Sequence, residues 1–228
     1  MYTFLILSIP LVLLIFCTSN SSYGWKSFVP PLAIGGVTGI VVSFVKKFLI
    51  FSRYTWTASA ASACMHLFLT QALLPFVLCY AVFLIFSRDS LAYKLESSGA
   101  LMGSFFAVYI PFVVISGSDK AAFFLNFGKP LLYAGLCVWF AEWCALGASN
   151  LKNKKIVPAV CFFVIAALNL VVPAFAESHW YFSDSFAWTV FAVIYVALSI
   201  CFYVFLNRGQ PDYVIRAEGS IPRRSASK

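Results

Sequence analysis

The residues that could carry chemistry in this chain are a few polar side chains within long apolar stretches, namely His66, Thr70, Gln71, Glu142 and Asn169. Polar and ionisable groups are costly in hydrocarbon, and they mark solute, ion or proton pathways more often than polar surface groups do. His66 and Thr70 are four residues apart and share one helix face. These five residues are our candidate binding residues, and they indicate no particular cofactor.

Glu142 is the one carboxylate inside the stretches that we predict to span a membrane. A carboxyl group at that depth is expected to be protonated, paired with a base or in contact with water. The functional interpretation is a proton or cation site. The structural interpretation is a buried acid that pairs with a lysine of residues 152–155, or one that hydrogen bonds hold neutral.

Two prolines stand four residues after the candidate amides. Pro75 lacks the N–H that would bond to the carbonyl of Gln71, and Pro173 has the same relation to Asn169, so we predict a helix kink at each proline. Two kinked helices with amides and free carbonyls could line a polar cavity near Gln71, Glu142 and Asn169. The alternative is that the amides bond to neighbouring helices and only hold the bundle together.

A small-residue face is formed by Gly35, Gly36 and Gly39, which lie on one predicted helix. Glycines at this spacing allow another helix backbone to approach closely. A phosphate-binding loop is not indicated, because no strand precedes the glycines and no Lys-Ser/Thr pair follows them. We therefore interpret them as helix-packing residues.

Three potential metal ligands lie close together in a segment that we expect to be an external loop: Glu177, His179 and Asp184. Their spacing matches no established ligand pattern, so they are weak candidates and no metal site is predicted. The sequence contains no HExxH zinc motif, no GxSxG nucleophile motif and no Walker loop. An enzyme would need two of the scattered polar groups to converge, and an enzyme is the less favoured class.

The elements that must position these residues are membrane-spanning helices. Of the 228 residues, 62% are hydrophobic, 18% aromatic and only 11% charged, whereas a soluble domain has about 25% charged residues. This composition excludes a soluble globule, a disordered chain, a coiled coil and a disulfide scaffold. The net charge of +8 does not indicate nucleic-acid binding, because the basic residues lie between apolar runs, where they act as topology signals.

Apolar stretches of about 20 residues are long enough to cross a bilayer as helices. They predict an all-α, polytopic integral membrane bundle of about seven transmembrane helices. A short interfacial segment, residues 48–57, is expected after the second helix because it mixes apolar, aromatic and cationic side chains. The first span has a signal peptide as its alternative. The predicted spans are residues 3–19, 28–47, 62–86, 99–117, 130–148, 156–176 and 185–206.

The chain divides into a transmembrane bundle, residues 1–206, and a flexible basic tail, residues 207–228. With seven spans, the connections on the side of the tail carry more Lys and Arg than those on the other side. The positive-inside rule then predicts a cytoplasmic C-terminus, with a cell (inner) membrane as the expected location. The expected partners are the lipid bilayer and other membrane subunits, and not nucleic acid.

These features leave three functional interpretations. The favoured one is a transport or channel component, working alone or as a subunit, with a polar cavity near Gln71, Glu142 and Asn169. The second is a receptor-like or scaffolding subunit that binds partner proteins through its glycine face, its interfacial segment or its basic tail. The third and least favoured is an intramembrane enzyme.

Overall fold

The structure is a computed structural model that describes residues 25–49, 59–86, 100–110 and 123–208. All regular structure in these ranges is helical. The segment η1 is a 3₁₀-helix, and η2 and η3 are π-helical. The elements are η1 (Trp25–Phe28), α2 (Val29–Leu49), α3 (Ala60–Leu67), η2 (Phe68–Leu73), α4 (Leu74–Phe86), a helix at Ala100–Ile110, η3 (Phe124–Gly128), α6 (Lys129–Lys152), α7 (Ile156–Asn169), α8 (Val171–Ser183) and α9 (Ala187–Arg208).

The described ranges contain five helical segments that are long and apolar enough to cross a membrane. The apolar helix Ala100–Ile110 is shorter. The prediction of an all-helical membrane bundle is confirmed at this level, whereas the count of seven spans is not. Predicted span 3–19, residues 111–117 of the fourth span, most of the interfacial segment and residues 209–228 lie outside the described residues. The five segments are Val29–Lys46, Ala60–Val82, Phe124–Lys152, Ile156–Ser183 and Ala187–Phe205.

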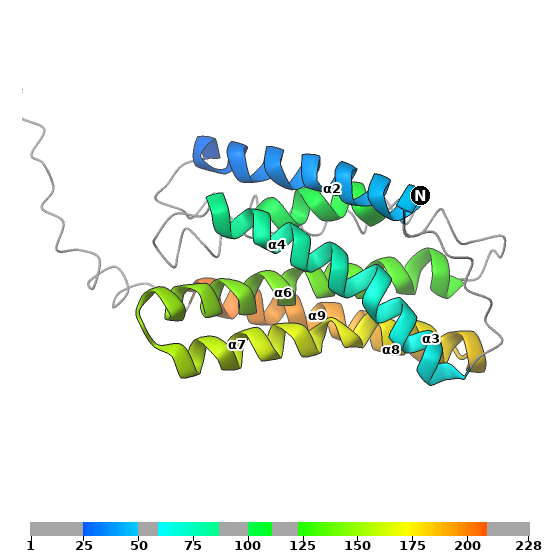
Figure 1. Cartoon of the computed structure of the whole chain (residues 1–228). Coiled ribbons are helices and arrows are strands. Elements are labelled where there is room, and N and C mark those ends of the chain that lie inside the picture. Colours follow the sequence, from blue (N-terminus) through cyan, green and yellow to red (C-terminus); the bar gives the residue numbers. More distant parts are fainter. Residues whose placement is uncertain (1–24, 50–58, 87–99, 111–122, 209–228) are drawn as a thin grey trace, which may run out of the picture.

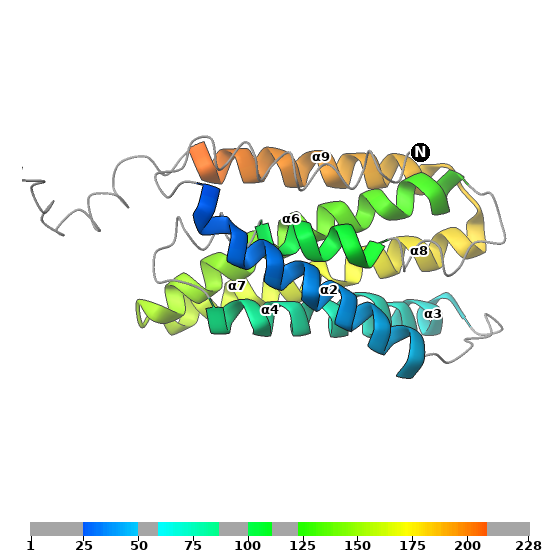
Figure 2. The same ribbon diagram turned by 90° about the horizontal axis from the view of Figure 1, so that it is seen from above.

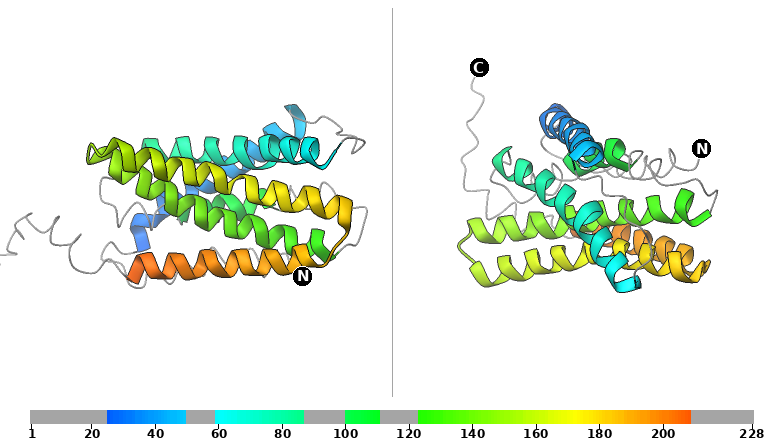
Figure 3. Two further views of the ribbon diagram at one scale, coloured as in Figure 1. Left: turned by 90° about the horizontal axis from the view of Figure 1, so that it is seen from below. Right: turned by 45° about the vertical axis from the view of Figure 1, so that its right-hand side comes forward.

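The central helix of the bundle is α6. In its membrane-length segment 83% of the residues are buried, against 22–33% in the other four. It forms an antiparallel hairpin with α7, and α9 lies along another of its faces (Figures 1 and 2). The segment α3–η2–α4 and, obliquely, α2 cross the bundle on the remaining sides (Figures 2 and 3). The apolar outer faces of these helices suit contact with lipid.

Successive membrane-length segments run in opposite directions, so the bundle has two distinct ends. At one end α2 and α8 finish while α3, α6 and α9 begin; we call it the α8 end (Figure 1). At the opposite end the turn between α6 and α7 is closed by a hydrogen bond from Lys155 N to Asn150 O at 2.9 Å. Lys154 in this turn has a φ of 59°. The depth of each polar residue in the bundle is its distance from the α8 end.

The glycines of α2 pack against the helix Ala100–Ile110. A Cβ atom on Gly35 would clash with the carbonyl oxygen of Leu101, and one on Gly39 would lie 3.0 Å from that of Phe105. A Cβ atom on Gly36 would meet nothing within 4 Å. Two of the three glycines therefore bring two helix backbones of this chain into contact.

The sixth predicted span, residues 156–176, is longer than expected. The helix is interrupted at Leu170, three residues before Pro173, and then continues as α8 to Ser183. The prediction of an external loop is therefore wrong for Glu177 and His179, which are helical. The prediction that Glu142 is the one carboxylate inside a span is wrong too, because Glu177 lies in the segment Ile156–Ser183. The helix can continue because Glu177, which would be costly in hydrocarbon, has a basic partner within the bundle.

Candidate functional site

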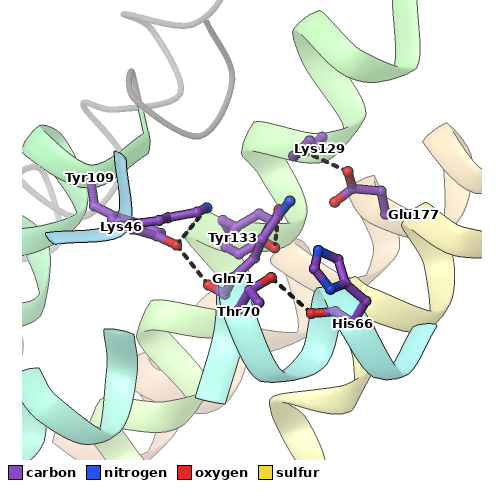
Figure 4. A network of polar contacts seen from close by, with 8 residues as sticks. All are labelled: Lys46, His66, Thr70, Gln71, Tyr109, Lys129, Tyr133 and Glu177. Atoms are coloured by element: carbon purple, nitrogen blue, oxygen red, sulfur yellow. Dashed lines mark hydrogen bonds and ion pairs between the residues drawn. The ribbon is translucent and has the colours of Figure 1, made fainter. Parts of the chain in front are cut away.

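Six polar side chains from five helical elements lie near one another at the α8 end of the bundle (Figure 4). We call this group the polar network. Four of its members are buried, and the other two, Lys46 and Gln71, are half-buried. The members are Lys46 of α2, Gln71 of η2, Tyr109 of the helix Ala100–Ile110, Lys129 and Tyr133 of α6, and Glu177 of α8.

An ion pair joins α6 to α8 in the polar network. The Nζ atom of Lys129 lies 2.6 Å from Oε1 of Glu177, and the two side chains are only 6% and 1% exposed. The second oxygen, Oε2 of Glu177, is buried and has no hydrogen-bond partner among the described residues. A buried pair of this kind must be retained as a pair, because removal of one member leaves an uncompensated charge.

Gln71 is held by two tyrosine hydroxyl groups. Tyr109 donates to the backbone carbonyl oxygen of Gln71 at 2.9 Å, and Tyr133 donates to its side-chain Oε1 at 3.0 Å. The carbonyl is open to Tyr109 because Pro75 has no N–H to occupy it. Both acceptor groups of Gln71 are thus used, while its amide nitrogen makes no hydrogen bond to a described residue.

Lys46 completes the polar network from α2. Its Nζ atom donates to the hydroxyl of Tyr109 at 3.3 Å and lies 5.3 Å from the centre of that ring. No described hydrogen bond or ion pair joins Lys46, Gln71 and the two tyrosines to the pair of Lys129 and Glu177. The polar network thus consists of two neighbouring groups of contacts, with two basic side chains and one carboxylate in all.

His66 and Thr70 lie beside the polar network on α3 and η2 (Figure 4). The hydroxyl of Thr70 donates to the backbone oxygen of His66 at 2.8 Å. Among the five sequence candidates, the structure thus brings His66, Thr70 and Gln71 together.

The other two candidates occupy separate environments. Glu142 is fully buried, and neither carboxylate oxygen has a hydrogen-bond partner among the described residues. Its predicted partner, a lysine of residues 152–155, does not pair with it. Asn169 accepts a hydrogen bond from Tyr195 of α9 at 3.4 Å and donates to the carbonyl of Ile165 at 3.0 Å. No described contact joins Gln71, Glu142 and Asn169 to one another.

The weak metal candidates do not converge in the described residues. Glu177 pairs with Lys129, and Nδ1 of His179 lies 3.0 Å from the carbonyl oxygen of Phe175. Asp184 is exposed at the end of α8. The described ranges contain no group of three His, Cys, Asp or Glu side chains that could hold a metal ion.

Sequence reasoning missed Lys46, Tyr109, Lys129 and Tyr133. The two lysines stand at the edges of predicted spans, so they were interpreted as topology signals. The helix that contains Lys129 in fact begins earlier, with η3 at Phe124, which places this lysine more than one turn inside. A usable signal was the four-residue spacing of Lys129 and Tyr133, which puts both on one helix face.

The polar network offers ammonium, carboxylate, amide and phenol groups at one buried place. This combination suits the binding of a charged group by hydrogen bonds and charge. The chain matches no protein-family model, no curated protein and no solved structure. Its function is therefore inferred from the geometry of the polar network.

Proposed function

We propose that this chain is a membrane transport component, acting alone or as a subunit, and that the polar network is its solute site. The observation that carries the proposal is the buried pair of Lys129 and Glu177, whose Oε2 atom lacks a partner among the described residues. Insertion scales assign a single charged residue a cost of up to about 2.5–3.5 kcal/mol, the value that applies at a helix centre. Apolar side chains would pack this region at lower cost, and this favours a binding role.

The backbone around the polar network supports the proposal. The π-helical segment η2 carries Gln71, and the π-helical segment η3 leads directly into Lys129. A third irregularity, at Leu170, separates α7 from α8. Irregular helices of this kind are frequent at functional sites and supply free backbone groups to polar regions within a membrane.

The remaining candidates extend the proposed pathway inward. Asn169 precedes Glu177 by eight residues, and Glu142 follows Lys129 by thirteen, which correspond to depths of about 12 and 20 Å at 1.5 Å per residue. The polar network, Asn169 and Glu142 thus lie at successive depths from the α8 end. In the proposed mechanism solute binds at the polar network, and Glu142 carries a coupling proton.

The orientation belongs to the same proposal. A cytoplasmic C-terminus would place the end of α9 on the inner side of the membrane and the α8 end on the outer side. The polar network would then receive solute from outside. The scaffolding alternative has less support from the glycine face, because Gly35 and Gly39 already pack against a helix of the same chain.

Reconstitution of the full chain into liposomes tests the proposal. Radiolabelled phosphate, lactate, glutamate, lysine and glucose would be supplied separately, with and without a proton gradient. We expect uptake of one class of solute by the parent, loss of that uptake in Glu177→Gln, and retention in Lys155→Gln, which alters an exposed lysine at the opposite end.

The same uptake assay tests separately whether Glu142 carries the coupling proton. Glu142→Gln should keep uptake down a solute gradient but lose the response to a proton gradient, because Gln keeps the shape without the titration. Folded parent protein that moves none of the five solutes would contradict the transport proposal.

A further inference from the structure

We infer that the polar network binds an oxyanion, that is, the carboxylate or phosphate group of a ligand. This inference rests on the proposed function, because it assigns a chemical class to the same solute site. It also makes a claim about binding that can be tested without transport. Three features of the contacts carry it.

The first feature is the charge balance. The polar network contains two basic side chains, Lys46 and Lys129, and one carboxylate, Glu177. Glu177 bonds to Lys129 at 2.6 Å, while Lys46 bonds only to the neutral hydroxyl of Tyr109. One basic side chain of the polar network therefore has no carboxylate partner among the described residues. A bound anion would supply that partner and would favour the protonated form of Lys46.

The second feature is the distribution of hydrogen-bond donors. Tyr109 and Tyr133 occupy both acceptor groups of Gln71, which leaves the two N–H donors of its amide. The Gln71 side chain extends from η2 toward Tyr133 (Figure 4). The ammonium of Lys46 also has donors in excess of its one bond to Tyr109. These unused donors suit an acceptor-rich group, and an oxyanion has several acceptor lone pairs in one small volume.

The third feature is the free oxygen of Glu177. Its Oε2 atom is buried without a partner among the described residues, so it would repel a fully deprotonated anion placed against it. An oxyanion that also carries a hydroxyl group, such as hydrogen phosphate or a hydroxycarboxylate, would donate to this oxygen. The polar network thus favours such ligands over a simple halide.

Two sources could supply this group: a dissolved anion or the phosphate of a lipid headgroup. Lys46 is the last residue of its membrane-length segment, which places the polar network within a few turns of the bundle end. The experiment must therefore distinguish bound solute from bound lipid. Both sources offer acceptor oxygens to the same donors, whereas the phosphodiester of a lipid headgroup has no P–OH that could donate to Oε2 of Glu177.

The test is a binding titration of the purified full chain in an uncharged detergent. Thermal unfolding would be followed at constant ionic strength while sodium chloride is replaced by sodium phosphate or sodium lactate. We expect saturable stabilisation by an oxyanion and a dissociation constant raised roughly tenfold or more in Lys46→Gln, because one charge-assisted bond is lost. Lys155→Gln, at the opposite end, should match the parent. Gln71→Glu is a second variant, which replaces the amide donors with a negative group. It should abolish the stabilisation by phosphate or lactate.

Native mass spectrometry identifies the source. A phospholipid retained by the parent and lost from Lys46→Gln would assign the oxyanion to a headgroup. Stabilisation by neither phosphate nor lactate, with no retained phospholipid, would overturn the inference. Oxyanion binding without flux in liposomes would contradict transport alone, whereas flux of glucose or lysine without oxyanion binding would contradict this inference alone.

Discussion

Glu177 and Glu142 are both buried within membrane-length helices, but their surroundings differ. Glu177 has the ammonium group of Lys129 at 2.6 Å, in the polar network at the α8 end. Glu142 lies on α6, about 20 Å along that helix from Lys129 by the rise per residue. Neither of its carboxylate oxygens has a hydrogen-bond partner in the described ranges. One carboxylate is thus compensated by a fixed charge, whereas the other is not.

The difference shows two ways to keep an acid inside a bundle. A fixed ionic partner makes the acid part of the structure, because breaking a buried pair leaves a charge behind. Without such a partner, a bound proton is the simplest means of removing the cost of a buried charge. The first acid is suited to hold helices and ligands in place, and the second is suited to exchange a proton.

The largest expected effect is the loss of the ion pair. Glu177→Ala should lower the free energy of unfolding in detergent by about 3–5 kcal/mol, because Lys129 is left buried and unpaired. The measurement is denaturant-induced unfolding in mixed micelles. The control is the double variant Lys129→Met/Glu177→Leu, which removes both charges and should be more stable than Glu177→Ala. A double variant as unstable as the single one would mean that side-chain volume, and not charge, sets the stability there.

A smaller loss is expected from displacing α2, which carries Lys46. Gly35→Ala should cost about 1–3 kcal/mol, because its Cβ would clash with the backbone oxygen of Leu101. Gly36→Ala is the matched control: its Cβ meets nothing within 4 Å, and replacing a helical glycine by alanine is favourable by up to about 1 kcal/mol. The same unfolding assay measures both variants. Equal stabilities would contradict the close packing of α2 against the helix Ala100–Ile110.

The smallest effect on stability is expected at Glu142. Glu142→Gln should change the free energy of unfolding by less than about 1 kcal/mol, because no described ionic or hydrogen-bonded partner is lost. Glu142→Leu should also be tolerated, since an apolar side chain of similar size replaces an uncompensated acid. A loss as large as that of Glu177→Ala would show that both carboxylates are structural, and the comparison between them would no longer hold.

Much of the helical architecture could be predicted from local sequence. Predicted spans 28–47, 62–86, 130–148 and 185–206 correspond to described helices whose ends differ by a few residues, apart from the five residues of η3 that precede α6. Apolar length is a local property, so it needs no knowledge of the tertiary arrangement. The relation between Pro75 and Gln71 is local too, because proline removes a defined N–H group.

Which residues form the polar network could not be predicted from local sequence. Its contacts join residues far apart in the chain: 63 positions for Lys46 and Tyr109, 38 for Tyr109 and Gln71, and 48 for Lys129 and Glu177. Each contact depends on the rotation and depth of two helices. The helix that contains Lys129 begins earlier than predicted, at η3, and the helix that contains Glu177 continues farther, through α8. Both residues therefore lie deeper in the bundle than the predicted spans indicate.

The sequence by itself determined that this chain forms apolar helices of membrane length and that few polar groups lie within them. Hydrophobicity and helix-breaking residues act over one or two turns, which is why these features follow from local patterns. Only the tertiary structure decided that Lys129 meets Glu177, that two tyrosines hold Gln71 and that Glu142 has no described partner. The physical reason is that burial and pairing of charges are set by neighbouring helices, whose identity, rotation and depth no local pattern specifies.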